Sequence, residues 1–155
     1  MKLTINCLIV ALLVLFAAQN SNQEKDQKQT ETAEPAKIQQ LLTDQTKLWN
    51  EKDIEGFMQT YWKSKDLTFS SGGSTTRGWQ ATLDRYKSKY PPEKMGELRF
   101  DNLEVSVLSN DVALVLGTWH LKMKETAPEG NFSLVLKKLS GEWKIVHDHS
   151  SLKEK

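Results

Sequence analysis

Cysteine is nearly absent from this sequence: its 155 residues include only Cys7, close to the N-terminus. If the N-terminal segment is cleaved off, the mature chain carries no thiol. A disulfide, a cysteine nucleophile and a cysteine-based metal site are then excluded. Cys7 is also an unsuitable site for lipid attachment, because Asn6 precedes it and the apolar run follows it instead of leading up to it.

The sequence also lacks an excess of charge of either sign. Its 21 Lys and Arg residues face 20 Asp and Glu residues, which gives a formal net charge of +1. No run of basic residues stands out, so the electrostatic footprint of a nucleic-acid-binding protein is missing. We therefore expect no nucleic-acid partner. The length, with 38% apolar and 26% charged residues, fits one globular domain.

The apolar run near the N-terminus is too short to cross a membrane. It extends from Cys7 to Ala18 (CLIVALLVLFAA), whereas a spanning helix needs roughly 20 apolar residues. A basic residue, Lys2, precedes the run and polar residues follow it, which is the order of a secretory signal peptide. We predict a signal peptide over residues 1–20 and an exported protein, periplasmic or extracellular. The alternative is an uncleaved anchor, which would then be the protein's only contact with a membrane.

Large apolar residues are missing from the next segment as well. Residues 21–35 (SNQEKDQKQTETAEP) cannot contribute to a hydrophobic core. We predict a disordered linker here, and a helical extension of the following element is the alternative.

Hydrophobic periodicity begins at Ile38 and predicts three helices. Apolar residues recur at steps of three and four as far as Trp49, which indicates an amphipathic helix over about 36–52. Asp53 is a plausible N-cap for a second helix. Two prolines, Pro91 and Pro92, stop a third. The elements predicted after the first helix are a helix over 53–62, a short strand hairpin within 66–77 and a helix over 78–90.

Three or four long strands follow the helices. Turn signals delimit them at about 98–108, 112–124, 131–138 and 143–150. Consecutive strands with short connections pair antiparallel. Helices first and strands afterward therefore predict an α+β domain, with helices packed on one face of a curved antiparallel sheet.

Several segments, taken in order, resemble the nuclear transport factor 2-like superfamily. They are LWNEKDIEGFMQTYWKSKDLTFSSGGSTTRG, GWQATLDRYKSKYP, DVALVLGTWHL and GEWKIVHDHSS. The chain looks closest to the SnoaL-like branch, of the uncharacterised domain-of-unknown-function 4440 type. The resemblance implies one such domain over 36–152, a cone of three N-terminal helices on a curved antiparallel sheet that encloses a pocket and commonly forms a homodimer. The segment VALVLGTW is apolar on both strand faces, which suits a sheet covered on both sides.

The superfamily includes the ketosteroid isomerases, whose chemistry needs a carboxylate base, a tyrosine and a protonated acid. By similarity in spacing, the tyrosine position falls near Gln45 and the base near Ser71. The second acid falls within residues Asn131 to Leu139, which include no Asp or Glu. None of the three is matched, so we assign no catalytic residue. Asp66 would come near the base position after a small alignment shift, but it equally suits an ordinary strand entry.

No metal or cofactor is expected. His147 and His149 lie two residues apart on the last strand, where they could face one ion. Two imidazoles do not complete a site, however, and no pattern brings the third histidine, His120, near them.

Asp148 is the residue of greatest interest. The closing-strand geometry of the resembled family directs Val146, Asp148 and Ser150 toward the pocket, with Trp143 and the two histidines on the opposite face. A buried carboxylate must be hydrated, hydrogen-bonded or paired. Arg77 is a candidate partner, and another polar group of the wall is the alternative. The pocket candidates are Tyr61, Arg77, Trp79, Trp119, His120 and Asp148. For the aromatic residues the alternative is core filling, and for Arg77 it is exposure to solvent.

Two functions remain open. The first is an exported, non-catalytic domain that binds a small, partly apolar ligand or serves as a dimeric interaction module. The second is an isomerase- or hydrolase-like enzyme with Asp148 or Asp66 as general base and Tyr61 or His120 as proton donor. Two ionisable groups within hydrogen-bonding reach in one cavity would favour the enzyme.

Overall fold

The computed structural model describes residues 33–153. The expected signal peptide and most of the expected linker lie outside the described residues. Residues 33–35, which we placed in the linker, are already helical. The first helix thus begins earlier than the predicted residue 36.

The helix over residues 33–50 buries one face, as its periodicity predicted. Ile38, Leu42, Gln45 and Trp49 lie on that face. Helix α2 (Ile54–Met58) begins at the predicted N-cap, since the side chain of Asp53 accepts a hydrogen bond from the amide of Gly56 at 2.8 Å.

Helix α2 is shorter than the predicted 53–62. Its continuation is prevented because the backbone of Thr60 and Trp62 pairs with Ile145 of the last strand. The amide of Ile145 donates to the carbonyl of Thr60, and the amide of Trp62 donates to the carbonyl of Ile145. This pairing fixes Tyr61 beside the sheet.

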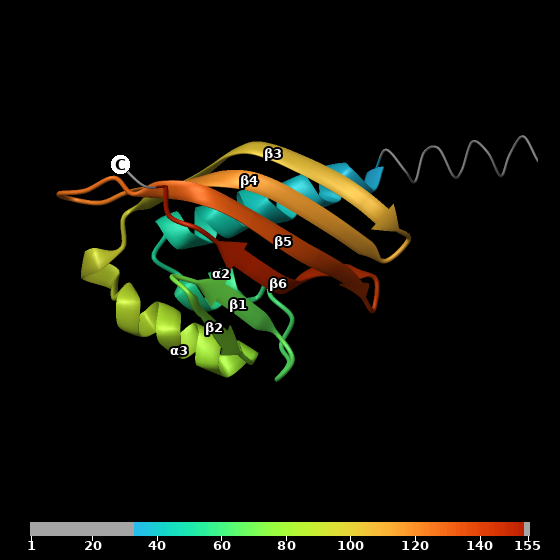
Figure 1. Ribbon diagram of the computed structural model, residues 1–155, viewed down its shortest axis with the longest axis horizontal. Helices are drawn as coiled ribbons and strands as arrows, with labels where there is room; N and C mark the ends of the chain where they lie inside the picture. The colour runs from blue at the N-terminus through green and yellow to red at the C-terminus, as the bar shows by residue number, and fades with distance from the viewer. Residues whose placement is uncertain (1–32, 154–155) are drawn as a thin grey trace, which may run out of the picture. The chain divides into compact units, whose positions relative to one another are not determined.

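The middle of the chain forms a hairpin and a helix, as predicted. Strands β1 (Thr68–Ser71) and β2 (Ser74–Arg77) pair antiparallel, and helix α3 (Trp79–Lys89) follows, with a short 3-10 turn η1 (Pro92–Lys94) after it. The turn places Gly72 and Gly73 at φ values of 61° and 76°, which glycine adopts without strain. Figure 1 shows α3 and the β1–β2 hairpin lying close together.

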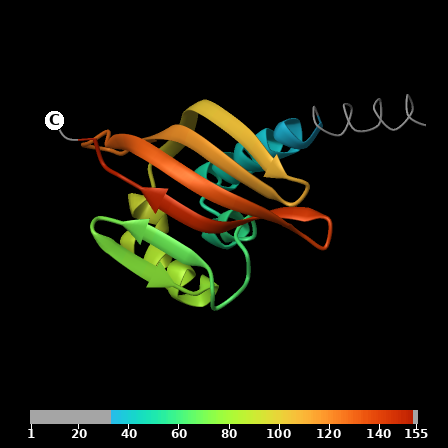
Figure 2. The same cartoon turned by 45° about the vertical axis from the view of Figure 1, so that its right-hand side comes forward.

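Six strands form one curved sheet in the order β2-β1-β6-β5-β4-β3. The long strands are β3 (Glu97–Ser109), β4 (Val112–Lys122), β5 (Glu129–Leu139) and β6 (Glu142–Ser150). All neighbours are antiparallel except β1 and β6, which run parallel. The architecture is the predicted α+β type, but the sheet is mixed rather than wholly antiparallel (Figures 1 and 2).

A β-bulge in β6 changes which residues face the helices. Leu136 pairs with Ile145 and Val135 with His147, so Val146 has no partner of its own on β5. Directly paired residues share a face of the sheet. Trp143, Ile145 and Asp148 therefore lie on the same face, and our placement of Trp143 on the opposite face was wrong.

The core lies between the helices and this inner face of the sheet. Its fully buried members include Ile38, Leu42, Met58, Val115, Leu136 and Ile145. None of the helices formed by the described residues combines the length and apolar content that a membrane crossing needs.

Candidate functional site

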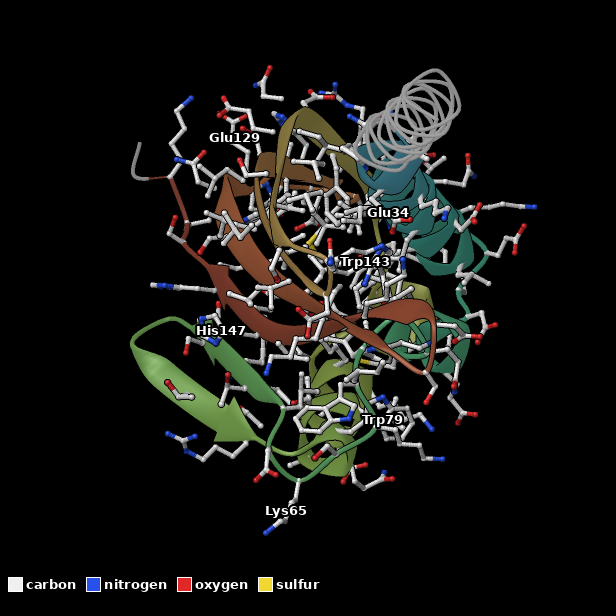
Figure 3. All side chains as sticks on the ribbon, turned by 90° about the vertical axis from the view of Figure 1, so that its right-hand side faces the viewer. Glu34, Lys65, Trp79, Glu129, Trp143 and His147 are labelled. Atoms are coloured by element: carbon white, nitrogen blue, oxygen red, sulfur yellow. The ribbon has the colours of Figure 1, made fainter. Side chains whose placement is uncertain are left out.

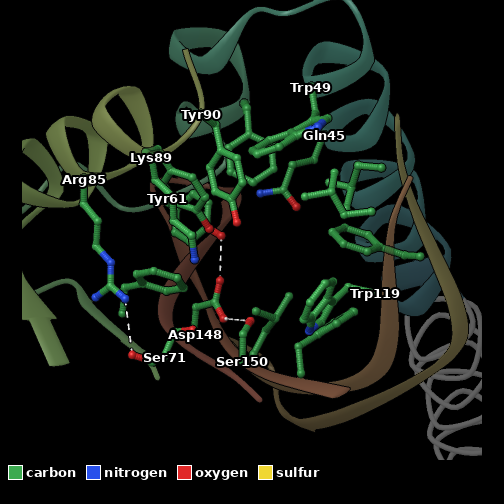
Figure 4. Close-up of a pocket in the computed structure, with 18 of the residues that line it drawn as sticks. Gln45, Trp49, Tyr61, Ser71, Arg85, Lys89, Tyr90, Trp119, Asp148 and Ser150 are labelled. Carbon is green, nitrogen blue, oxygen red and sulfur yellow. Dashed lines mark hydrogen bonds between the residues drawn. The ribbon is translucent and has the colours of Figure 1, made fainter. Parts of the chain in front are cut away.

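A cavity of about 270 Å³ lies between the inner face of the sheet and the helices. Aromatic residues are the largest group in its wall. The aromatic residues that line it are Trp49, Phe57, Tyr61, Phe69, Tyr86, Tyr90, Phe100, Trp119 and Phe132. The polar lining consists of Gln45, Ser71, Arg85, Lys89, Asp148 and Ser150 (Figure 4).

Asp148 is the carboxylate of this cavity. It is 4% exposed. The hydroxyl of Tyr61 donates to its Oδ2 at 2.7 Å, and the hydroxyl of Ser150 donates to its Oδ1 at 3.0 Å (Figure 4). Burial raises the pKa of Asp148 to about 6, while the hydrogen bonds from Tyr61 and Ser150 oppose the rise because they favour the charged form.

Tyr61 reaches Asp148 because its backbone is joined to β6. An isolated parallel bridge pairs Tyr61 with Ile145, three residues before Asp148. Burial, followed by the nearby charge of Asp148, raises the pKa of Tyr61 well above its ordinary value. Burial and Asp148 also raise the pKa of Tyr86. Both phenols therefore keep their protons at neutral pH, and Tyr61 donates its proton to the hydrogen bond with Asp148.

Two cations complete the wall on the side of α3. Arg85 donates to the hydroxyl of Thr76 at 2.8 Å and to the carbonyl of Ser71 at 3.2 Å, and its guanidinium lies 4.9 Å from the centre of the Phe69 ring. Lys89, one turn further along α3, is exposed. Its ammonium lies 5.3 Å from the centre of the Tyr90 ring.

Of the predicted pocket residues, the structure brings together Tyr61, Trp119 and Asp148. The indole of Trp119 donates to the carbonyl of Ser151 at 3.0 Å, which joins β4 to the residue that follows β6.

The other three candidates lie elsewhere. Arg77 is exposed on β2, and Asp148 is hydrogen-bonded instead by Tyr61 and Ser150, which corresponds to the alternative of another polar group of the wall. Trp79, at the start of α3, is buried and its indole donates to the carbonyl of Met58 at 2.8 Å (Figure 3). Trp79 is therefore a core residue.

His120 faces away from the cavity. It pairs with Glu129 across β4 and β5, on the outer face of the sheet. Its ring nitrogens lie 3.2 Å from Asp101 and 2.9 Å from Glu129. Successive side chains of a strand point to opposite faces of the sheet. Trp119 and Leu121 line the cavity, so His120 between them points to the other face and cannot donate a proton inside the pocket.

Arg85 and Lys89 were missed by reasoning from the sequence. The signal was present in α3, where Arg85 and Lys89 recur at i, i+4 beside Tyr86 and Tyr90 at the same spacing. Residues four apart lie on one face of a helix. A face that combines two cations with two tyrosines is compatible with a wall that meets both solvent and a ligand.

The positions of the resembled isomerase residues do face the cavity. Gln45 and Ser71 line it, as do Phe132 and Leu134 of the segment expected to hold the second acid. The carboxylate of this pocket instead comes from β6.

The described residues contain no group of three or more His, Cys, Asp or Glu side chains placed to hold a metal ion. His147 lies where β6 runs beside β1, and its Nδ1 is 2.6 Å from the hydroxyl of Thr68 (Figure 3).

The chain belongs to the SnoaL-like domain family, whose model matches residues 38–153. It shares the nuclear transport factor 2-like fold. A nuclear transport factor 2-like protein of unknown function from Shewanella oneidensis is 41% identical, with 76% of this chain and 98% of that chain covered and a TM-score of 0.73.

More distant structures share the fold alone. A candidate scytalone dehydratase from Novosphingobium aromaticivorans is 13% identical, with 82% of this chain and 89% of that chain covered and a TM-score of 0.70. A nuclear transport factor 2-like protein of unknown function from Pseudomonas putida is 18% identical, with 80% and 89% covered and a TM-score of 0.68. No curated protein matches this sequence.

Proposed function

We propose that this domain binds a small, partly apolar molecule in the aromatic cavity, with Asp148 as its polar anchor. The observation that carries the proposal is a buried carboxyl group, hydrogen-bonded by Tyr61, inside a cavity of about 270 Å³. A carboxylate buried without a cation is costly. A protein that only filled its core would avoid that cost, whereas a binding site uses such a group to orient its ligand.

The proposal is tested by a thermal-shift screen of small molecules on the full chain. A ligand that binds only the native state raises the melting temperature. Hits should stabilise the wild type and the exposed control Arg77→Gln alike, and their effect should fall for Asp148→Asn. A screen without hits, or hits indifferent to Asp148→Asn, would contradict the proposal.

A second candidate is acid–base catalysis on the bound molecule. Two observations favour it: Tyr61 and Asp148 lie within hydrogen-bonding distance in one cavity, and the pKa of Asp148 is raised to about 6. A carboxylate with this pKa is ionised at neutral pH and is a stronger base than an exposed one. It would remove a proton from a carbon next to a carbonyl group, while Tyr61 remains protonated. The fold neighbour described as a candidate scytalone dehydratase is compatible with such chemistry.

Hydrogen–deuterium exchange in heavy water distinguishes binding alone from acid–base catalysis. A hit with a C–H bond next to a carbonyl group should exchange that hydrogen for deuterium if Asp148 acts as a base. The exchange rate, followed by NMR, should rise with pH through about 6 and disappear in Asp148→Asn. Binding without exchange would leave the non-catalytic function standing alone.

We further propose that the domain is exported after removal of the signal peptide and works as a homodimer. The apolar run of residues 7–18 supports export.

Support for a dimer comes from the outer face of the sheet, where Leu116 is 43% exposed beside the half-buried Leu114 and Val135. We also propose that, within the SnoaL-like family, the domain is of the domain-of-unknown-function 4440 type.

A further inference from the structure

We infer that the ligand of this pocket is an anion, a small planar or aromatic carboxylate whose charged group lies against Arg85 and Lys89 at the mouth. The inference rests on the proposed ligand-binding function and names the chemical class of the ligand. It follows from how charge is distributed along the wall.

The cavity has an acidic group at its base and basic groups at its mouth. Asp148 is buried, whereas Lys89 is exposed and Arg85 is half-buried, so the carboxyl lies at the base and the cations lie toward solvent. Arg85 and Lys89 come from α3, on the side of the pocket away from Trp119 (Figure 4). Among the described residues that line the cavity, Asp148 is the only acid.

The two cations do not neutralise Asp148. The groups that act on the pKa of Asp148 are Tyr61, Ser150 and His149, in addition to burial. Neither Arg85 nor Lys89 is among them. Had either cation lain close to the carboxylate, it would have lowered that pKa.

Arg85 and Lys89 also have no acidic partner in the described part of the chain. The hydrogen bonds of Arg85 go to an uncharged hydroxyl and a backbone carbonyl. Lys89 contacts the ring of Tyr90. By contrast, Lys87 on the same helix pairs with Glu55 at 2.5 Å. The positive charge at the mouth is therefore available to a ligand.

These features define the ligand's shape and polarity. Aromatic walls favour a flat apolar body, which stacks on or packs edge-on against rings. The guanidinium of Arg85 is held in place by Ser71 and Thr76, and its remaining N–H groups suit a carboxylate. The anionic end stays at the mouth, because at the base it would meet the charge of Asp148. The end that enters the cavity is then uncharged and can donate a hydrogen bond, or a proton, to Asp148.

The test uses three probes that share the naphthalene ring and carry polar groups of different charge: 2-naphthoate, the neutral 2-naphthamide and the cationic 2-naphthylmethylammonium. Binding to the full chain is measured by calorimetry at pH 7.5 and low salt. We expect 2-naphthoate to bind on the order of tenfold more tightly than 2-naphthamide, as one charge-assisted contact provides. The cation should bind most weakly. Added salt should reduce the preference for the anion.

Affinities of variants show which residues cause the preference for 2-naphthoate over 2-naphthamide. Lys89→Gln and Arg85→Gln should each lower the affinity for 2-naphthoate several-fold and leave 2-naphthamide unchanged, and the double variant should abolish the preference. Lys87→Gln, on the same helix but outside the cavity lining, is the matched control and should have no effect. Shifts of the indole N–H signals of Trp49 and Trp119 in NMR spectra confirm binding in the cavity, because both residues line it.

The outcomes separate the two proposals. Equal affinities for 2-naphthoate and 2-naphthamide, or a preference that survives the double variant, would overturn the anion inference while the ligand-binding function stands. Failure of all three probes to bind, with unchanged Trp49 and Trp119 signals, would overturn both.

Discussion

Asp148 is unusual because it is buried without a cation, and that has a thermodynamic consequence. Its carboxyl accepts hydrogen bonds from two uncharged hydroxyls, those of Tyr61 and Ser150. These bonds offset only part of the cost of removing the charge from water, so the pKa stays raised at about 6. The folded state therefore binds the Asp148 proton more tightly than the unfolded chain does.

This linkage predicts how stability changes with pH. With a folded pKa above the unfolded value, the stabilisation from Asp148 is complete below the unfolded pKa and is lost as pH rises through about 6. The shift from 3.8 to about 6 corresponds to about 3 kcal/mol over the whole window. Urea unfolding of the wild type and Asp148→Asn from pH 3 to pH 8 should show the variant gaining relative stability as pH rises. A constant difference between the two proteins would contradict it.

Tyr61→Phe should move the titration of Asp148. The variant removes the hydroxyl that donates to Oδ2, a bond that favours the charged carboxylate. The pKa of Asp148 should therefore rise further above 6. The measurement is NMR titration of the Asp148 carboxyl carbon, with Tyr90→Phe as the control, since Tyr90 lines the cavity and does not bond to Asp148. A downward shift in Tyr61→Phe would reverse the assigned role of the hydroxyl.

At the scale of elements, the segment that follows β6 belongs to the pocket wall and is bonded to the start of β5: Leu152 lines the cavity, and the amide of Ser151 donates to the carbonyl of Asn131. Gly130 pairs with Trp119, and a Cβ added to Gly130 would lie 1.9 Å from the carbonyl oxygen of Ser151. The same oxygen accepts the hydrogen bond of the Trp119 indole. Backbone occupies this space, so a side chain there cannot be accommodated by rotation alone.

Gly130→Ala should therefore displace residues 150–152 from the sheet. We expect a loss of about 1–3 kcal/mol in the free energy of unfolding, typical of overpacking a tight site. Urea unfolding measures it, with the exposed neighbour Asn131→Ala as the control. The amide of Ser151 donates to the backbone carbonyl of Asn131, so removing the Asn131 side chain leaves this bond in place. Equal stability of the two variants would show that the chain end adapts without cost.

At the scale of the whole molecule, the outer face of the sheet predicts association. Leu116 is exposed there beside Leu114 and Val135, and burying such apolar area in a partner's sheet would be favourable. Sedimentation at micromolar concentration should show a dimer. Leu116→Arg should shift it toward monomer, whereas Leu108→Arg, at a leucine 64% exposed at the end of β3, should not. A monomeric wild type would exclude this dimer.

Export makes a separate prediction about the covalent chain. Cys7 is the only cysteine and lies within the expected signal peptide. Protein recovered from the periplasm or medium should therefore give no reaction with a thiol reagent, and its mass should match a chain that begins near residue 21. A thiol-positive product would show that the segment is retained as an anchor. Cytoplasmic material from the same culture provides the positive control.

The sequence by itself determined what depends on short-range chemistry. Apolar steps of three and four produced the first helix, Asp53 capped α2, Pro91 and Pro92 ended α3, and turn residues separated the long strands. The family and the fold followed from the order of these elements. The inward direction of Asp148 came from the resemblance, because strand parity counted from the buried Trp143 points Asp148 outward.

Only the tertiary structure decided the rest. The bulge at Val146 places Trp143 and Asp148 on one face, and the parallel pairing of β1 with β6 joins Thr68 to His147, 79 residues later. Contacts between residues so far apart leave no local period in the sequence. The same holds for the pocket. Tyr61 bonds to Asp148, 87 residues later, because a backbone bridge holds Tyr61 beside β6. Arg85 lies at the mouth because α3 packs beside the β1–β2 hairpin.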